Sequence, residues 1–236
     1  MINEIIRDAL LFSCSILFAF SLDYKRSGKF WYILLLFFVV GFVDNTFNTI
    51  TMIYPNTQLI SPSIFNNLYF NWSAKLYSIV FAIFLSVLLR RIISPLEIGL
   101  SLKQNKGSIR FSLGFIMIIC LIASGLGMLS SKTPFEGEIL LYTAIMPGLS
   151  EELIYRGLLL GLLNKIFEKR YRLLKTNFGW GAIITSLIFG FLHGFQLSDN
   201  FQFQFDFITI LLSGIYGFIY ALIRERSGSL VFPIVA

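Results

Sequence analysis

The chain has 236 residues, of which 56% are hydrophobic and only 14% are charged, and its mean hydropathy is +0.76. Soluble domains are roughly 45–50% apolar and about 25% charged, so this composition excludes a soluble globule. The formal net charge is +6, but the basic residues stand in short clusters between apolar runs, which excludes nucleic acid as a partner. The composition therefore predicts an all-α fold, a polytopic transmembrane helical bundle embedded in a lipid bilayer.

Eight apolar runs follow one another along the chain, and a membrane span needs roughly 20 residues. They cover residues 5–22, 30–47, 71–89, 110–129, 138–163, 178–197, 206–223 and 229–236. Seven runs meet or nearly meet the required length, and the eighth stops at Ala236. We therefore expect about eight spans, the last one incomplete. Residues 1–109 are predicted to form N-terminal transmembrane helices with an interfacial segment, and residues 110–236 the functional core.

Lys and Arg are concentrated in alternate loops between these runs. Fifteen of the nineteen lie in loops 23–29, 90–110, 165–177 and 224–228. Because cytoplasmic loops carry the excess of basic residues, these loops are predicted to be cytoplasmic and the N-terminus to lie outside, in a bacterial cytoplasmic membrane. Lys75 is assigned to the outer side. In the inner loop that contains Pro95, residues 97–103 are predicted to form a short amphipathic segment at the interface.

Residues 147–157, with the sequence PGLSEELIYRG, place charged side chains inside the fifth apolar run. A helix that starts near Ile139 would place Glu151 about 18 Å along its axis, near the middle of a ~30 Å hydrocarbon core. A charge at that depth costs roughly 2.5–3.5 kcal/mol, so the cluster predicts a functional site. Glu152 and Arg156 have the spacing of a helical ion pair. Glu151 is then expected to lack a charged partner and to act as a general base, unless the cluster is only a structural lock.

His193 is the only histidine of the chain, and it lies in the next apolar run. Two adjacent helices could bring His193 and Glu151 to one water molecule, although a lone histidine at a helix end can also be structural. A single histidine excludes an HExxH zinc protease and a conventional multi-histidine zinc site. Asp44 and Asp206 lie near the ends of runs, where we expect solvated or capping roles.

The charged cluster and the histidine resemble two motifs of the CPBP family of intramembrane proteases, which includes type II CAAX prenyl endopeptidases and Abi-type proteins. The first motif is two adjacent Glu followed by Arg after three residues, and it matches Glu151, Glu152 and Arg156. An aromatic residue, here Tyr155, usually precedes that Arg. The second motif is Phe followed four residues later by His.

Phe189 and His193 match this second motif, and the resemblance covers roughly residues 130–236. Residues 228–233 resemble the approach to a third motif, a second His with Asn or Asp four residues on. That motif would begin just past Ala236, so we expect the chain to be a fragment or the product of a prematurely ended reading frame, and its activity in this form is doubtful.

The resemblance implies an intramembrane endopeptidase that acts on a membrane-associated protein or peptide. Glu151 and His193 would activate a water molecule that attacks a peptide carbonyl. The residues that would support the site are Glu152, Arg156, Tyr155 and Phe189. Members of the family have been described both as metalloproteases and as glutamate-type proteases. One histidine and one free glutamate favour a reaction that requires no cofactor; if zinc were bound, Glu151 and His193 would be its ligands.

Two other functions are compatible with the same residues. An inactive relative could act as an immunity or scaffold membrane protein that binds its partner in the same space. A proton-coupled transporter could use Glu151, Arg156 and His193 as a relay. The chain shows no internal repeat, which argues against the transporter.

Overall fold

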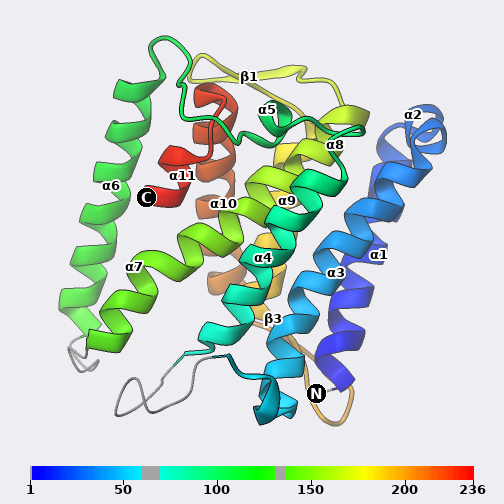
Figure 1. The fold of residues 1–236 in the computed structure, drawn as a ribbon, viewed down its shortest axis with the longest axis vertical. Helices are drawn as coiled ribbons and strands as arrows, with labels where there is room; N and C mark the ends of the chain where they lie inside the picture. The colour runs from blue at the N-terminus through cyan, green and yellow to red at the C-terminus, as the bar shows by residue number, and fades with distance from the viewer. Residues whose placement is uncertain (1, 60–69, 131–136) are drawn as a thin grey trace.

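Helices that run alternately in opposite directions make up most of the structure (Figure 1). This computed structural model describes residues 2–59, 70–130 and 137–236. The predicted all-α fold class is confirmed, because the strands within these ranges form only two short antiparallel hairpins. N-terminal helices α1 and α3 lie along one side of the bundle, and α6 lies along the other.

The long elements follow the order of the apolar runs. The helices are α1 (Ile2–Leu22), α2 (Tyr24–Lys29), α3 (Trp31–Ile53), η1 (Pro55–Thr57), α4 (Trp72–Leu88), α5 (Pro95–Ile98), α6 (Ser108–Ser130), α7 (Gly137–Glu151), η3 (Glu152–Leu159), α8 (Leu160–Ile166), α9 (Trp180–Gly194), α10 (Phe207–Ser227) and α11 (Val231–Val235). The strands are β1 (Tyr171–Leu173), β2 (Thr176–Phe178), β3 (Phe195–Leu197) and β4 (Phe203–Phe205). Helices α7, η3 and α8 follow one another without a break and correspond to the fifth run.

Three helices of the described ranges, α1, α3 and α10, are long and apolar enough to cross a membrane. Helices α4 and α9 are apolar but have only 17 and 15 residues. Many large apolar side chains on the outer surfaces of the helices are exposed. Because water would disfavour such a surface, these features indicate an integral membrane protein.

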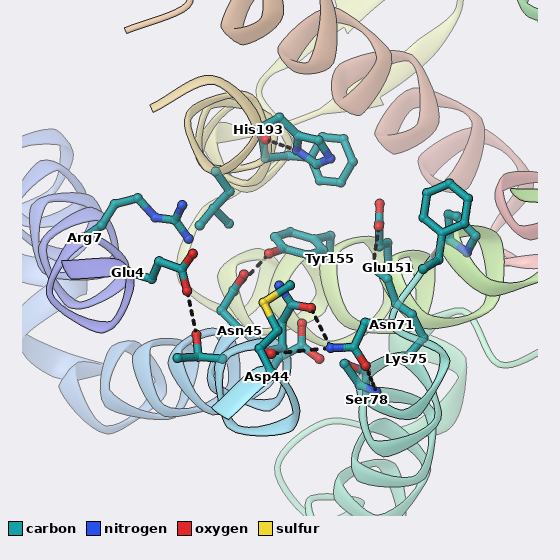
Figure 2. Close-up of a pocket in the computed structure, with 18 of the residues that line it drawn as sticks. Glu4, Arg7, Asp44, Asn45, Asn71, Lys75, Ser78, Glu151, Tyr155 and His193 are labelled. Atoms are coloured by element: carbon teal, nitrogen blue, oxygen red, sulfur yellow. Dashed lines mark hydrogen bonds and ion pairs between the residues drawn. The ribbon is translucent and has the colours of Figure 1, made fainter. Parts of the chain in front are cut away.

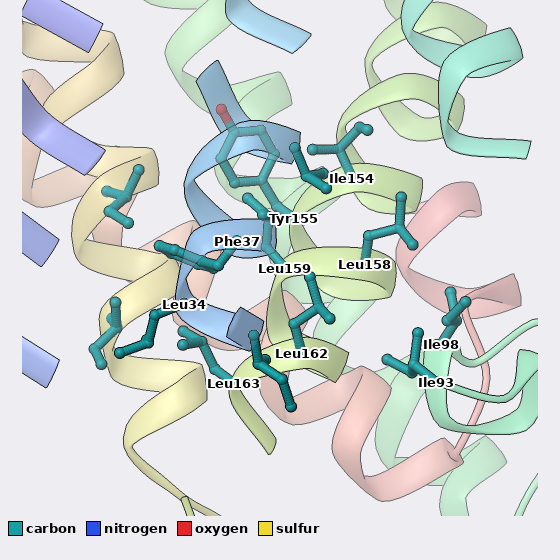
Figure 3. Close-up of a cluster of buried hydrophobic side chains, with 14 of the residues drawn as sticks. Leu34, Phe37, Ile93, Ile98, Ile154, Tyr155, Leu158, Leu159, Leu162 and Leu163 are labelled. Atoms are coloured by element: carbon teal, nitrogen blue, oxygen red, sulfur yellow. The ribbon is translucent and has the colours of Figure 1, made fainter. Parts of the chain in front are cut away.

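The hydrophobic core lies around η3 and α8. Every residue from Glu152 to Leu163 is buried, and Figure 3 shows leucines of this stretch between side chains of α3 and the segment that contains α5. At Gly161, a Cβ atom would lie 2.5 Å from Cδ1 of Ile93. The chain before α5 can therefore pack directly on α8 only because this position has no side chain. Close packing of this kind holds helices together where lipid replaces water.

Helix α5 is shorter than the amphipathic segment predicted for residues 97–103. Ser94 caps it in a reciprocal capping box with Glu97. Gly99, with φ of +89°, ends it in the left-handed region, which glycine adopts without strain. The helical part of this region is therefore Pro95–Ile98, and the interfacial placement of residues 97–103 stays a prediction.

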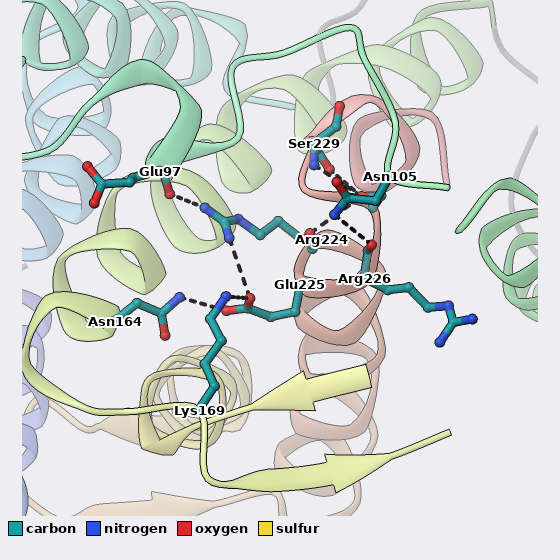
Figure 4. A network of polar contacts seen from close by, with 9 residues as sticks. Glu97, Asn105, Asn164, Lys169, Arg224, Glu225, Arg226 and Ser229 are labelled. Carbon is teal, nitrogen blue, oxygen red and sulfur yellow. Dashed lines mark hydrogen bonds and ion pairs between the residues drawn. The ribbon is translucent and has the colours of Figure 1, made fainter. Parts of the chain in front are cut away.

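A network of polar contacts ties the basic end of the bundle together (Figure 4). Arg224 of α10 donates to the Glu97 carbonyl oxygen. The Glu225 carboxylate pairs with Lys169 and accepts a hydrogen bond of 2.6 Å from Asn164. The loops predicted to be cytoplasmic lie at this end with α2, α5 and β1, and the N-terminus lies at the opposite end (Figure 1).

Candidate active site

A polar cavity of about 500 Å³ lies between α1, α3, α4, α7, η3 and α9. It is close to the N-terminal end of the bundle, because Glu4 near the start of α1, Met52 near the end of α3 and Asn71 at the cap of α4 all line it. Figure 2 shows charged and amide side chains of several helices facing this space. Four of the predicted site residues line it: the two predicted catalytic residues, Glu151 and His193, and the supporting residues Tyr155 and Phe189.

Glu151 is the last residue of α7 and forms an ion pair with Lys75 in the first turn of α4. Lys75 Nζ lies 2.6 Å from Glu151 Oε1. The prediction that Glu151 lacks a charged partner was therefore wrong. The distribution of basic residues had assigned Lys75 only to the outer side of the membrane. The packing of α4 against α7 brings its side chain to the carboxylate.

Glu152 and Arg156 form the ion pair that their spacing predicts. Arg156 Nη1 lies 2.8 Å from Glu152 Oε1, and the two side chains are only 2% and 4% exposed. The guanidinium carbon also lies 4.3 Å from the ring centroid of Phe189 and 5.5 Å from that of Tyr220. The buried charge is thus stabilised by its partner and by aromatic faces. This pair packs in the core and does not line the 500 Å³ cavity.

The change from α7 to the π-helical segment η3 falls between the two adjacent glutamates. A π-helix, with hydrogen bonds from residue i to i+5, is rare and is found frequently at functional sites. Pro147, one turn before the change, lies inside α7 and cannot donate a backbone hydrogen bond. Apart from this proline, the sequence contains no signal for the π-helical segment.

His193 lies in the last turn of α9, with one ring nitrogen fixed by the helix. Its Nδ1 is 2.8 Å from the carbonyl oxygen of Phe189. Because a carbonyl oxygen can only accept, this contact places the hydrogen on Nδ1 and leaves Nε2 as the free nitrogen of the neutral ring. The Phe189 ring lies 4.4 Å from the imidazole and 5.3 Å from the Tyr155 ring, measured between centroids. Contacts therefore connect the two sequence motifs.

Several cavity residues were not identified from the sequence as part of a site. Asp44 lies inside α3, nine residues before its end, and faces the cavity, so its expected role at a span end was wrong. Asn45 donates to the Tyr155 hydroxyl over 3.2 Å. A charged residue within an apolar run was the available signal for Asp44. Asp206, in contrast, caps α10 by accepting from the Thr209 backbone at 3.1 Å, as expected.

The side chains around Glu151 and His193 do not by themselves form a catalytic zinc site. Such a site takes three protein ligands. In residues 2–59, 70–130 and 137–236, no group of three or more His, Cys, Asp or Glu side chains gathers closely enough to hold a metal.

Comparison with known proteins identifies the C-terminal part of the chain. The family model of the type II CAAX prenyl endopeptidase Rce1-like domain matches residues 136–236. No curated protein and no solved structure gives a significant match. The resemblance to CPBP proteases is therefore confirmed for this segment, which is similar to the domain of CAAX-type proteases. The matched segment includes Glu151 and His193, whereas Asp44 and Lys75 lie outside it.

Proposed function

We propose that this protein is an intramembrane endopeptidase that hydrolyses a peptide bond of a membrane-associated protein or peptide. One observation carries the proposal: Glu151 and His193, from two separate motifs, line the same polar cavity inside an apolar helical bundle. A polar space of this kind can hold the water and the peptide group that hydrolysis requires.

In the proposed reaction, Glu151 is the general base. Its carboxylate takes a proton from a water molecule whose oxygen attacks the carbonyl carbon of the substrate, while His193 Nε2 accepts a hydrogen bond that orients this water. The electron pair of the C=O bond moves onto the carbonyl oxygen. When the tetrahedral intermediate collapses, the C–N bond breaks and the amine nitrogen receives the proton held by Glu151. The products are a new carboxyl group and a new amine.

Four further side chains would hold Glu151 and His193 in place without touching the reacting atoms. They are Glu152, Arg156, Tyr155 and Phe189. The Glu152–Arg156 ion pair fixes η3 immediately after Glu151. Phe189 packs on Arg156 and on the His193 ring, so it links the Glu152–Arg156 ion pair to His193. Fixed side chains of this kind hold reacting groups in a productive geometry.

We also propose that the site faces the outer side of a bacterial cytoplasmic membrane. The cavity lies near the N-terminal end of the bundle, and the loops rich in Lys and Arg lie at the other end. The positive-inside rule assigns those loops to the cytoplasm. Substrates would then present the cleaved bond at or near the outer surface.

Cleavage of a library of membrane-tethered peptides in proteoliposomes tests the proposed reaction. Replacement of Glu151 by Gln should lower the cleavage rate by about 10²–10⁴-fold, because the base is removed while the size of the side chain is kept. Glu97→Gln, at the basic end of the bundle, is the matched control and should cleave like the wild type. Full activity in Glu151→Gln would exclude the proposed mechanism and favour a binding protein without catalysis.

A further inference from the structure

Lys75 is the cavity cation that lies next to the proposed base. Its Nζ is 2.6 Å from Glu151 Oε1, and the two side chains are 25% and 20% exposed, so both can reach a molecule in the cavity. Lys75 belongs to α4 and lies outside the segment that matches the protease family. Nothing in the family match therefore assigns it a role.

Stability alone is a weak reason for placing a lysine here. Desolvation of two charges can cost as much as their attraction returns, so a largely buried ion pair contributes little to stability. A cation beside a general base also weakens that base, because it stabilises the carboxylate form. The position of Lys75 makes chemical sense if its ammonium group has a second partner during the reaction.

The ammonium group of Lys75 has the reach and the donors for such a second partner. It carries three N–H donors on a flexible four-carbon side chain. One donor can stay on Glu151 while another binds an oxygen atom in the adjoining space. In the proposed reaction, Glu151 would hold a water molecule, and the substrate carbonyl group would be positioned for attack by this water. Both groups would then lie within a few ångströms of the carboxylate.

Among the residues that the structure describes, two further cations near the site have other partners. Arg7 lines the cavity at the α1 side, where it pairs with Asp8 at 2.7 Å. Arg156 pairs with Glu152 in the core, with its guanidinium group against the Phe189 ring. Of these cations, only Lys75 is paired directly with Glu151.

We infer that Lys75 is a further catalytic residue that stabilises the oxyanion. This inference rests on the proposed endopeptidase function. As Glu151 takes the proton from water and the water oxygen bonds to the carbonyl carbon, the electron pair of the C=O bond moves onto oxygen, which accepts a hydrogen bond from Lys75 Nζ. When the C–N bond breaks, the pair returns to re-form the C=O bond. Lys75 stays protonated throughout, so no further reactant is needed.

Kinetics of Lys75 variants in proteoliposomes test this role. Removal of one oxyanion donor typically lowers kcat by about 10²–10³-fold. We expect a loss of this size in kcat for Lys75→Met, little change in KM, and partial recovery in Lys75→Arg, which restores a cationic donor. Lys165→Met is the matched control, since it breaks a 2.5 Å Lys–Glu pair with Glu97 at the other end of the bundle.

Binding measurements separate this role from a structural one. A cleaved peptide is remade with a phosphinic acid in place of the scissile bond, which mimics the anionic intermediate, and with a neutral ketomethylene group. Lys75→Met should weaken phosphinic-peptide binding at least 10²-fold more than ketomethylene binding. If Lys75→Met weakens the binding of both peptides equally, or if its kcat is unchanged, the proposed role of Lys75 is overturned. If Glu151→Gln cleaves as fast as the wild type, or the wild type cleaves no peptide, the proposed function itself falls, and this inference falls with it.

Discussion

Glu151 and Glu152 are neighbours in the chain but have separate partners and surroundings. Glu151 faces the polar cavity and pairs with Lys75 at 2.6 Å, whereas Glu152 is buried and pairs with Arg156 at 2.8 Å. The π-helical segment begins between them. This division supports a role for Glu151 in the proposed reaction and a role for Glu152 in the fold, and each role can be tested separately.

The buried ion pair should contribute to stability in a way that depends on both partners. Arg156→Met leaves Glu152 as an uncompensated buried charge, so it should reduce the free energy of unfolding by about 3–5 kcal/mol. The double variant Glu152→Gln/Arg156→Met should have a free energy of unfolding closer to that of the wild type, because no unpaired charge is left in the core. Thermal unfolding in detergent measures both, with Arg91→Met at an exposed position as the control. An Arg156→Met protein as stable as that control would contradict this interpretation of the pair.

The contact between α8 and the chain before α5 requires a glycine. In Gly161→Ala, the added Cβ would lie 2.5 Å from Ile93 and 3.2 Å from the Glu97 carbonyl oxygen. We expect a loss of about 1–3 kcal/mol in the free energy of unfolding. The control is Gly114→Ala in α6, where no atom lies within 4 Å and alanine favours the helix. Similar stability of the two variants would show that the close approach is not a constraint.

The basic end of the bundle should lose stability in acid through Glu97. Partial burial raises the pKa of this carboxyl, but hydrogen bonds from Lys165 and Ser94 outweigh it and lower the pKa from 4.5 to about 2. A carboxyl whose pKa is lower in the folded state stabilises that state when the pH is above the pKa of the unfolded chain. This contribution is lost as the pH falls from about 4.5 to about 2. The difference in unfolding temperature between wild type and Glu97→Gln should therefore shrink across this range. A difference that stays constant would contradict the assignment.

The proposed orientation predicts which positions reagents can reach from outside the cell. With Cys14 and Cys120 replaced by Ser, Asn56→Cys near the N-terminal end should react with a membrane-impermeant maleimide in intact cells. Lys103→Cys at the basic end should react only after permeabilisation. Labelling of intact cells at Lys103→Cys and not at Asn56→Cys would reverse the orientation.

The features that could be predicted from the sequence are those that residues close together in the chain determine. The length and spacing of the apolar runs were sufficient for the order of the long helices, and four-residue spacing was sufficient for the Glu152–Arg156 pair. The Lys75–Glu151 pair joins residues that are 76 positions apart. It depends on how α4 packs against α7, which no local pattern encodes. Apart from Pro147, the sequence likewise contains no signal for the π-helical segment, so an uninterrupted α-helix was the natural expectation.

The central claim is that the cavity hydrolyses a peptide bond with water activated by Glu151. Cleavage in H₂¹⁸O followed by mass spectrometry of the products tests it most directly. The account predicts one ¹⁸O atom in the newly formed carboxyl group with the wild type, and loss of the labelled product with Glu151→Gln. Labelled product formed at the wild-type rate by Glu151→Gln, or a cleaved product without ¹⁸O, would contradict it.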